Sequence, residues 1–183
     1  MKATEILMQE HLLIQEVLDA LERGAQRLGS GTDTPKEFFL EAADFIRGFA
    51  DETHHKKEEG VLFPALAQYG FSLHAGPVAV MLSEHEEARR FTQALAEAAQ
   101  KLHRGDPSAR EDLIMYALSY ARHLRQHIMK ENNILFPMAD RVVPEAEAAR
   151  IEADFARVER DEIGADAHPK YPALARKLKD QMS

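Results

Sequence analysis

Two eleven-residue stretches of this chain pair a histidine with a glutamate four residues later. "HHKKEEGVLFP" begins at His54 and "HIMKENNILFP" begins at His127, and six of the eleven positions are identical. Residues four apart on a helix share one face. His54 and Glu58 can therefore bind one ion together, and so can His127 and Glu131. Imidazole and carboxylate ligands without sulfur suit iron or manganese, accommodate zinc and disfavour Cu(I).

A single His–Glu pair on a helix is more often a surface ion pair than a metal site, but here the repeat is longer than the pair. "MQEHLLIQEVLDAL" aligns with "LSEHEEARRFTQAL" 74 residues later, and both contain Glu-His and end in Ala-Leu. The chain is therefore interpreted as a duplicated helix pair with a pseudo-twofold axis. That symmetry brings six side chains to one buried point: His11, His54, Glu58, His85, His127 and Glu131. We interpret them as ligands of two ions, each held by two histidines, with both glutamates bridging.

Helices must position these residues. Apolar side chains recur at intervals of three and four, and proline-containing turn sequences separate long segments. The predicted helices span residues 4–28, 35–68, 77–102 and 107–140, with a shorter pair near 145–160 and 171–182. Thr34 and Glu37 form the pattern of a capping box at the start of the second helix. Short connections favour antiparallel neighbours, which predicts an all-α fold, an up-down four-helix bundle.

The bundle is expected to occupy residues 1–141. Residues 142–183 form a helical extension that packs on the bundle or in a homodimer. A chain of 183 residues is long enough for one domain with a sizeable core.

Composition excludes several kinds of site. The chain has no cysteine, which excludes disulfides and thiolate ligands. Its net charge of −8 argues against nucleic acid or an anionic membrane as a partner. No run of 18 apolar residues predicts a membrane span, and the N-terminus does not resemble a signal peptide. We therefore expect a cytoplasmic protein.

Three further side chains are candidates for an additional ligand or for hydrogen bonds that support one. His55 follows His54 directly, and His123 and Tyr120 lie one and two turns before His127. For each, the alternative is an ordinary polar or surface residue.

Other polar residues near the motifs are expected in solvent. Glu10 and Glu84 each precede a histidine of the set, and we interpret them as solvated or capping residues. Lys57 and Lys130 are likewise expected to be solvated. Three histidines in turn-like stretches are expected on the surface: His74, His103 and His168.

The pattern His, His-x-x-x-Glu, His, His-x-x-x-Glu on four successive helices resembles the hemerythrin-like HHE cation-binding domains over roughly residues 4–140. The resemblance implies a non-haem di-iron centre with an oxo or hydroxo bridge, in which manganese or zinc can replace iron. Glu58 and Glu131 would be the bridging carboxylates and the four histidines the terminal ligands. The implied partner is a small diatomic molecule or peroxide.

Two departures bear on function. Oxygen-carrying hemerythrins have His-x-x-x-His on the third helix and His-x-x-x-x-Asp on the fourth. Here Arg89 stands four residues after His85, and Asn132 stands five residues after His127. The pattern is closer to bacterial HHE proteins linked to peroxide, nitric oxide or iron handling.

Three functions stay open from sequence. One is a di-iron enzyme of the catalase or peroxidase kind. Another is a module that senses, buffers or stores oxygen or iron without turnover, and the last is a metal-free structural bundle.

Overall fold

The computed structural model describes residues 3–35, 37–163 and 170–183, and the secondary structure of these residues is helical without a strand. The predicted all-α class is confirmed. Labels α denote α-helices; η1, η2 and η4 are π-helical, and η3 is a 3-10 helix. The elements are α1 (Ala3–Ser30), α2 (Phe38–Phe45), η1 (Ile46–His55), η2 (Glu58–Leu62), α3 (Phe63–Gln68), α4 (Gly76–His103), η3 (Pro107–Ala109), α5 (Arg110–Lys130), η4 (Glu131–Leu135), α6 (Phe136–Val142), α7 (Glu145–Ile163) and α8 (Lys170–Gln181).

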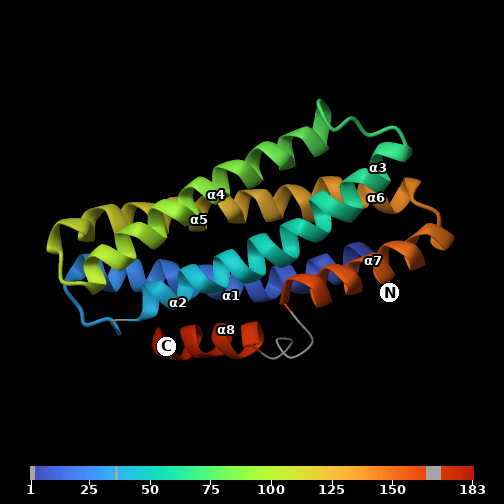
Figure 1. The fold of residues 1–183 in the computed structure, drawn as a ribbon. Helices are drawn as coiled ribbons and strands as arrows, with labels where there is room; N and C mark the ends of the chain where they lie inside the picture. Colours follow the sequence, from blue (N-terminus) through green and yellow to red (C-terminus); the bar gives the residue numbers. More distant parts are fainter. Residues whose placement is uncertain (1–2, 36, 164–169) are drawn as a thin grey trace.

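Several elements join into longer rods. The helical run from α2 through η1 and η2 to α3 forms one rod, and α5, η4 and α6 form another (Figure 1). Together with α1 and α4 they lie side by side along the long dimension of the molecule (Figure 1). Helix α5 packs against both α4 and α1, and α2 packs against α4. This arrangement lets every rod present one face to a shared interior.

The interior contains two apolar clusters with a polar zone between them. One cluster includes Ile14, Phe45 and Leu124, and the other includes Leu7 and Phe136. On α1, the buried His11 lies between residues of the two clusters, and His54, His85 and His127 lie at the corresponding boundary on the other three rods. The sequence thus places a histidine on each rod at the junction of the two apolar clusters.

The second helix begins later than predicted. Helix α2 starts at Phe38, and Glu37 precedes it without a capping hydrogen bond from its side chain. The Thr34 hydroxyl instead donates to the backbone oxygen of Thr32 at 3.4 Å. The capping box was therefore wrong, because Thr34 bonds within its own turn.

The C-terminal helices pack on the same chain. Helix α7 contacts η1, η2 and α1, and α8 contacts α1 and α2 (Figure 1). The Tyr171 ring of α8 lies 6.0 Å from that of Phe45 and 5.8 Å from that of Phe49, between ring centroids. The domain boundary at residue 141 stays a prediction. No helix among the described residues is both long and apolar enough to cross a bilayer.

Candidate metal centre

Five histidines and two glutamates meet in the polar zone, at most 2 % exposed. They form two groups, each with one potential ligand atom per residue and all such atoms within 4.8 Å of one another. The first group is His55, Glu58, His85 and His127, and the second is His11, His54, Glu58 and Glu131. The structure brings all six predicted residues together and adds His55. The first group thus contains three histidines where we expected two.

Each carboxylate lies between the two groups. The Glu58 oxygens are 3.6 Å from Nε2 of His54 and 3.3 Å from Nε2 of His85. The Glu131 oxygens are each 3.2 Å from an Nε2 atom, one on His11 and one on His127. Both glutamates therefore contact a histidine from each group, which is the placement a bridging carboxylate needs.

Several buried polar atoms at this point have no hydrogen-bond partner. They include Nε2 of His11 and His54 and both carboxylate oxygens of Glu58 and Glu131. Buried polar atoms are nearly always hydrogen-bonded, because leaving one unpaired costs about 1–3 kcal/mol. Buried nitrogen and oxygen atoms that converge without a hydrogen-bond partner fit a cation. The donor set of imidazole and carboxylate fits iron, manganese or zinc.

The outer nitrogens of these histidines have acceptors. Nδ1 of His54 donates to Glu10 at 2.8 Å, and Nδ1 of His127 donates to Glu84 at 3.0 Å. Because a carboxylate only accepts, each bond places the proton on Nδ1, which leaves Nε2 free to face inward. The expectation that Glu10 and Glu84 are solvated or capping was wrong.

The other pair of matched histidines is held from the opposite repeat. Nδ1 of His11 bonds Oδ1 of Asn132 at 2.8 Å, and Nδ1 of His85 donates to Glu59 at 2.6 Å. Asn132 and Glu59 occupy matched positions, so the two repeats exchange equivalent contacts.

Two lysines extend these contacts. Lys57 donates to Glu10 and to Glu159 of α7, and Lys130 donates to Glu84. Lys57 is fully buried, so the expectation that it is solvated was wrong.

In the absence of metal, the pKa values of several histidines and glutamates at the centre are strongly shifted. Burial, followed by the charge of Glu131, raises the pKa of Glu58 well above its usual range. Burial also opposes ionisation of Glu131, but His127 and His11 outweigh it and hold the pKa of Glu131 well below its usual range. Burial lowers the pKa of His55 to about 3 and that of His85 well below the ordinary value. The neutral histidines can use Nε2 as a metal ligand.

π-helical turns help to place the candidate ligands. Phe63 N–H bonds to the carbonyl of Glu58, and Phe136 N–H bonds to that of Glu131, each five residues back. This wider turn stands directly before Pro64 and Pro137, whose rings would clash with an ordinary helix. In η1, a similarly wide turn reduces the angle between consecutive residues, so His54 and its neighbour can both face the centre.

The phenylalanines of the two Leu-Phe-Pro segments cover the rings of two candidate ligands. Phe136 stacks on His11 with centroids 5.6 Å apart, and Phe63 stacks on His85 at 5.9 Å. Each ring comes from the opposite repeat and excludes water from one side of the centre.

Comparison with known proteins decides the family. The model of the hemerythrin HHE cation binding domain matches residues 2–139, about three quarters of the chain. This chain belongs to the hemerythrin HHE family. In such a domain the His/Glu cluster is the expected place for a bound cation, and the geometry above is consistent with that.

Individual relatives match only parts of the chain. The uncharacterized protein Mb2018 of Mycobacterium bovis is 29 % identical over 135 residues, which are 74 % of this chain and 52 % of the relative. The iron-sulfur cluster repair protein DnrN of Neisseria gonorrhoeae is 36 % identical over 103 residues, 54 % of this chain and 66 % of the relative. The iron-sulfur cluster repair protein YtfE of Escherichia coli O81 is 35 % identical over 89 residues, 48 % of this chain and 40 % of the relative. This HHE chain thus spans about half the length of the first of these relatives.

Two candidate residues lie away from the cluster of this HHE domain. Nε2 of His123 is 2.9 Å from the backbone oxygen of Glu84, and its ring packs against Phe91. Tyr120 is buried within an apolar cluster, and burial raises the pKa of its hydroxyl. Neither residue belongs to the two groups of potential ligands.

The other described histidines lie apart from the HHE cluster. His74 and His103 are exposed, as predicted, and His168 lies outside the described residues.

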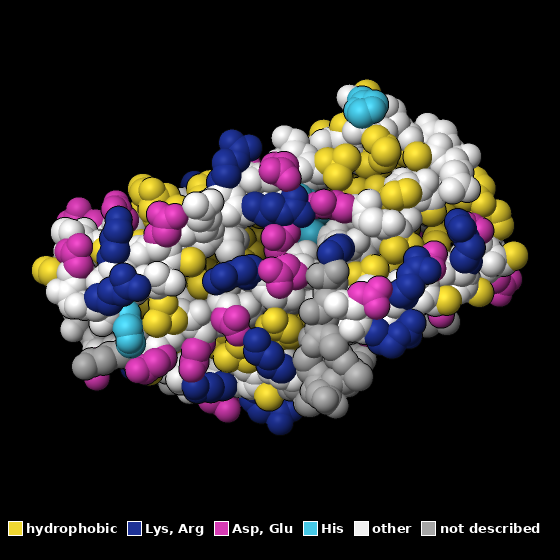
Figure 2. Space-filling view, in the orientation of Figure 1, with side chains coloured by type: hydrophobic (Ala, Val, Ile, Leu, Met, Phe, Trp, Pro, Cys, Tyr) yellow, Lys and Arg dark blue, Asp and Glu magenta, His cyan; other side chains and the backbone are white. Residues whose placement is uncertain are grey.

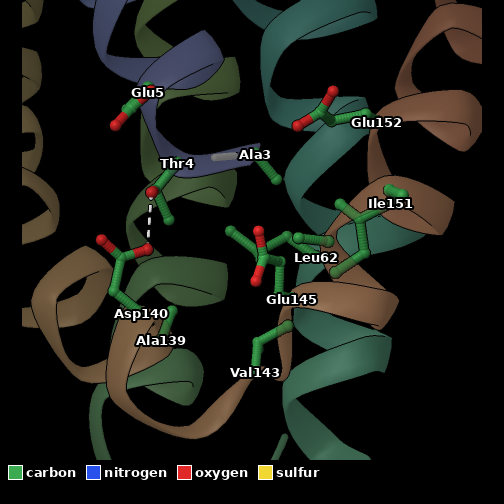
Figure 3. A pocket seen from close by; sticks show the side chains of 12 residues that line it. Ala3, Thr4, Glu5, Leu62, Ala139, Asp140, Val143, Glu145, Ile151 and Glu152 are labelled. Carbon is green, nitrogen blue, oxygen red and sulfur yellow. Dashed lines mark hydrogen bonds between the residues drawn. The ribbon is translucent and has the colours of Figure 1, made fainter. Parts of the chain in front are cut away.

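On the face shown in Figure 2, a histidine side chain is visible near the middle, between basic and acidic side chains. A pocket of about 730 Å³ lies elsewhere, between α1, α6, α7 and the end of η2 (Figure 3). Acidic and apolar side chains line it, and Thr4 donates to Asp140 across it at 2.7 Å. Its described lining contains no histidine, so it is separate from the HHE cluster.

Proposed function

We propose that the protein holds two iron ions between the two ligand groups and uses them to bind and reduce a small oxidant, namely O2, peroxide or NO. The ions would lie in a hemerythrin-like four-helix bundle formed by α1, the α2–α3 rod, α4 and the α5–α6 rod. Manganese or zinc could occupy the same ligands. The observation that carries this proposal is the convergence of buried nitrogens and carboxylate oxygens that have no hydrogen-bond partner.

The ligand roles follow from the contacts. Glu58 and Glu131 would bridge, because each touches histidines of both groups. The five histidines would supply Nε2. Nδ1 of four of them bonds an outer acceptor, and Nδ1 of His55 lies 3.5 Å from Asp51. Iron bound there supplies the electrons for reduction of the oxidant. The phenylalanines stacked on His11 and His85 would keep bulk water away from that side of the centre.

A second function is favoured by likeness to the repair proteins. Relatives named as iron-sulfur cluster repair proteins are 35 % and 36 % identical over the matched parts. We propose as the alternative that the chain senses, buffers or stores oxygen or iron without catalytic turnover. In that case a small diatomic ligand would bind to the iron centre and be sensed there, and it would not be consumed.

One set of measurements tests both functions. Protein reconstituted anaerobically with Fe(II) is expected to contain two irons per chain by elemental analysis and to lose both in Glu58→Ala. Oxygen evolution from added peroxide supports the enzyme, because it requires one peroxide to be reduced to water and a second to be oxidised to O2. Stable loading without turnover, with iron passed on to a chelator, supports the alternative. If wild-type protein and Glu58→Ala retain the same iron, the metal centre itself is refuted.

A further inference from the structure

Four side chains on one side of the centre break the twofold pattern. The six candidate ligands predicted from the repeat are matched in type, whereas these four residues have unlike counterparts in the other half. They are Asp51, His55, Glu59 and Arg89, which align with Leu124, Ile128, Asn132 and Gln15. The two halves therefore surround the centre with different chemistry, and the difference is concentrated around the first ligand group.

Arg89 binds three of the nearby carboxylates. Its Nε donates to Asp51 at 2.8 Å, one terminal nitrogen donates to Glu59 at 2.6 Å, and the other donates to Glu86 at 2.7 Å. All three guanidinium nitrogens are engaged. A planar fork can hold several acceptors in fixed directions, which a lysine ammonium on its flexible stem does less well.

Two of these carboxylates also face histidines of the first group. Glu59 accepts from Nδ1 of His85 at 2.6 Å, and Asp51 lies 3.5 Å from Nδ1 of His55. The His55 and His85 rings stack, with centroids 3.9 Å apart. The arginine touches neither ring and acts on both through its acceptors.

We propose that Arg89 is a positioning residue that makes the two metal positions unequal. By fixing Asp51 and Glu59 it orients His55 and His85, so that an ion in the first group is bound more tightly than an ion between His11 and His54. This inference rests on the proposed function, because it needs two ions in the centre.

The outer partners support the same order. The first group has a carboxylate beside each of its three histidines, from Asp51, Glu59 and Glu84. The second has one carboxylate and one amide, from Glu10 and Asn132. A carboxylate partner raises the basicity of the ligand, and losing such a partner typically weakens metal binding by about 10- to 100-fold.

Charge and geometry act in opposite directions when Arg89 is removed. Loss of a positive charge favours a nearby cation, whereas loss of the fork releases Asp51 and Glu59. Arg89→Lys keeps the charge and loses the fork, so it isolates the geometric effect. Arg125 provides a matched control, since it is similarly exposed and spans Asp19 and Glu22 at 2.9 Å on the outer surface.

The test is a titration of metal-free protein with Co(II), followed by visible absorption and by competition with a chelator. Wild-type protein is expected to bind two ions in two steps. Arg89→Lys and Arg89→Gln should weaken the tighter step by about 10- to 100-fold and change its absorption spectrum. The weaker step should stay as in wild type, and Arg125→Lys and Arg125→Gln should leave both steps unchanged. Helical circular dichroism of each metal-free variant verifies folding.

The outcomes separate the two claims. Failure of wild-type protein to bind two ions overturns the proposed function and this inference with it. Two wild-type steps that persist unchanged in both Arg89 variants overturn the inference alone, as does an equal loss in the Arg125 variants. Should the Arg89 variants not fold, Asp51→Asn, which reaches His55 directly, must weaken the same step for the inference to stand.

Discussion

Two lysines at matched positions of the repeat differ in their surroundings. Lys57 is buried between Glu10 and Glu159, whereas Lys130 is 35 % exposed beside Glu84. Lys57→Met should lower the free energy of unfolding by about 1–3 kcal/mol, because a buried acceptor loses its charged donor. Lys130→Met should cost less than about 1 kcal/mol, as is usual for exposed ion pairs. Urea denaturation of the two metal-free variants measures the difference.

The comparison is internally controlled, because both changes remove the same chemical group at the same place in the repeat. Equal losses of stability in the two variants would contradict the importance of burial under α7. A larger loss in Lys130→Met would mean that the exposed lysine contributes more to stability than the buried one.

Metal loading should release protons. In the metal-free centre, burial opposes protonation of His127, but Glu131 and Glu84 outweigh it and raise its pKa to about 9. Burial, followed by the charge of Glu131, also raises the pKa of Glu58 well above its usual range, so this carboxyl group keeps its proton to a higher pH than an exposed glutamate. A cation must displace the His127 proton, so affinity should rise with pH between about 6.5 and about 8.5, below the pKa of His127, by roughly a factor of ten per pH unit. Zn(II) titrations at both pH values check this, and an affinity independent of pH would contradict it.

At the residue scale, the repeat made the six candidate ligands predictable, because matched His and Glu positions have no packing explanation. The sequence did not decide whether His55 is a ligand, because its counterpart in the repeat is Ile128 and the direction of its side chain depends on the π-helical turn of η1. The outer acceptors Glu10 and Glu84 were misinterpreted. Their recurrence was the available signal, but their hydrogen bonds cross between helices, which a single-helix argument does not see.

At the scale of elements, the spacing of apolar residues predicted the helices but not the residue at which α2 begins. The π-helical segments were missed altogether, because hydrophobic spacing does not distinguish an i+4 from an i+5 hydrogen bond over a few residues. Pro64 and Pro137 were the local signs of irregularity, and the structure shows how the helix accommodates them. The segments η2 and η4 each begin at a candidate bridging glutamate.

Helix α8 depends on a glycine in η1. A Cβ added to Gly48 would lie 1.7 Å from the Tyr171 hydroxyl, and that ring is held between Phe45 and Phe49. Gly48→Ala should therefore lower the free energy of unfolding by about 1–3 kcal/mol. The measurement is chemical denaturation of the metal-free protein.

Gly60 is the matched control, because a Cβ there meets no heavy atom within 4 Å. Gly60→Ala should raise stability by about 0.5–1 kcal/mol, through the lower backbone entropy of the unfolded chain. If the two alanine variants are equally stable, the close packing of Tyr171 on Gly48 does not prevent a larger side chain at residue 48.

At the scale of the whole molecule, the polar zone divides the core. Apolar clusters on either side hold the rods together. The candidate ligands between them contain buried polar atoms without hydrogen-bond partners, and the pKa values of Glu58 and Glu131 are shifted in opposite directions. Buried charged groups destabilise a fold when they lack partners. The metal-free chain therefore carries a cost at its centre that a cation would remove, which couples loading to global stability.

The coupling predicts the thermal behaviour of the protein. A ligand that binds only the folded state at 100 times its Kd stabilises it by about 2.7 kcal/mol. For a chain of this length each bound ion then raises Tm by roughly 5–10 °C. Wild-type protein should show this rise with Fe(II) under anaerobic conditions, and a chelator should reverse it. Glu58→Ala should show no rise, because it loses a carboxylate shared by both groups; an equal rise in that variant would mean that the cation stabilises the fold from some other site.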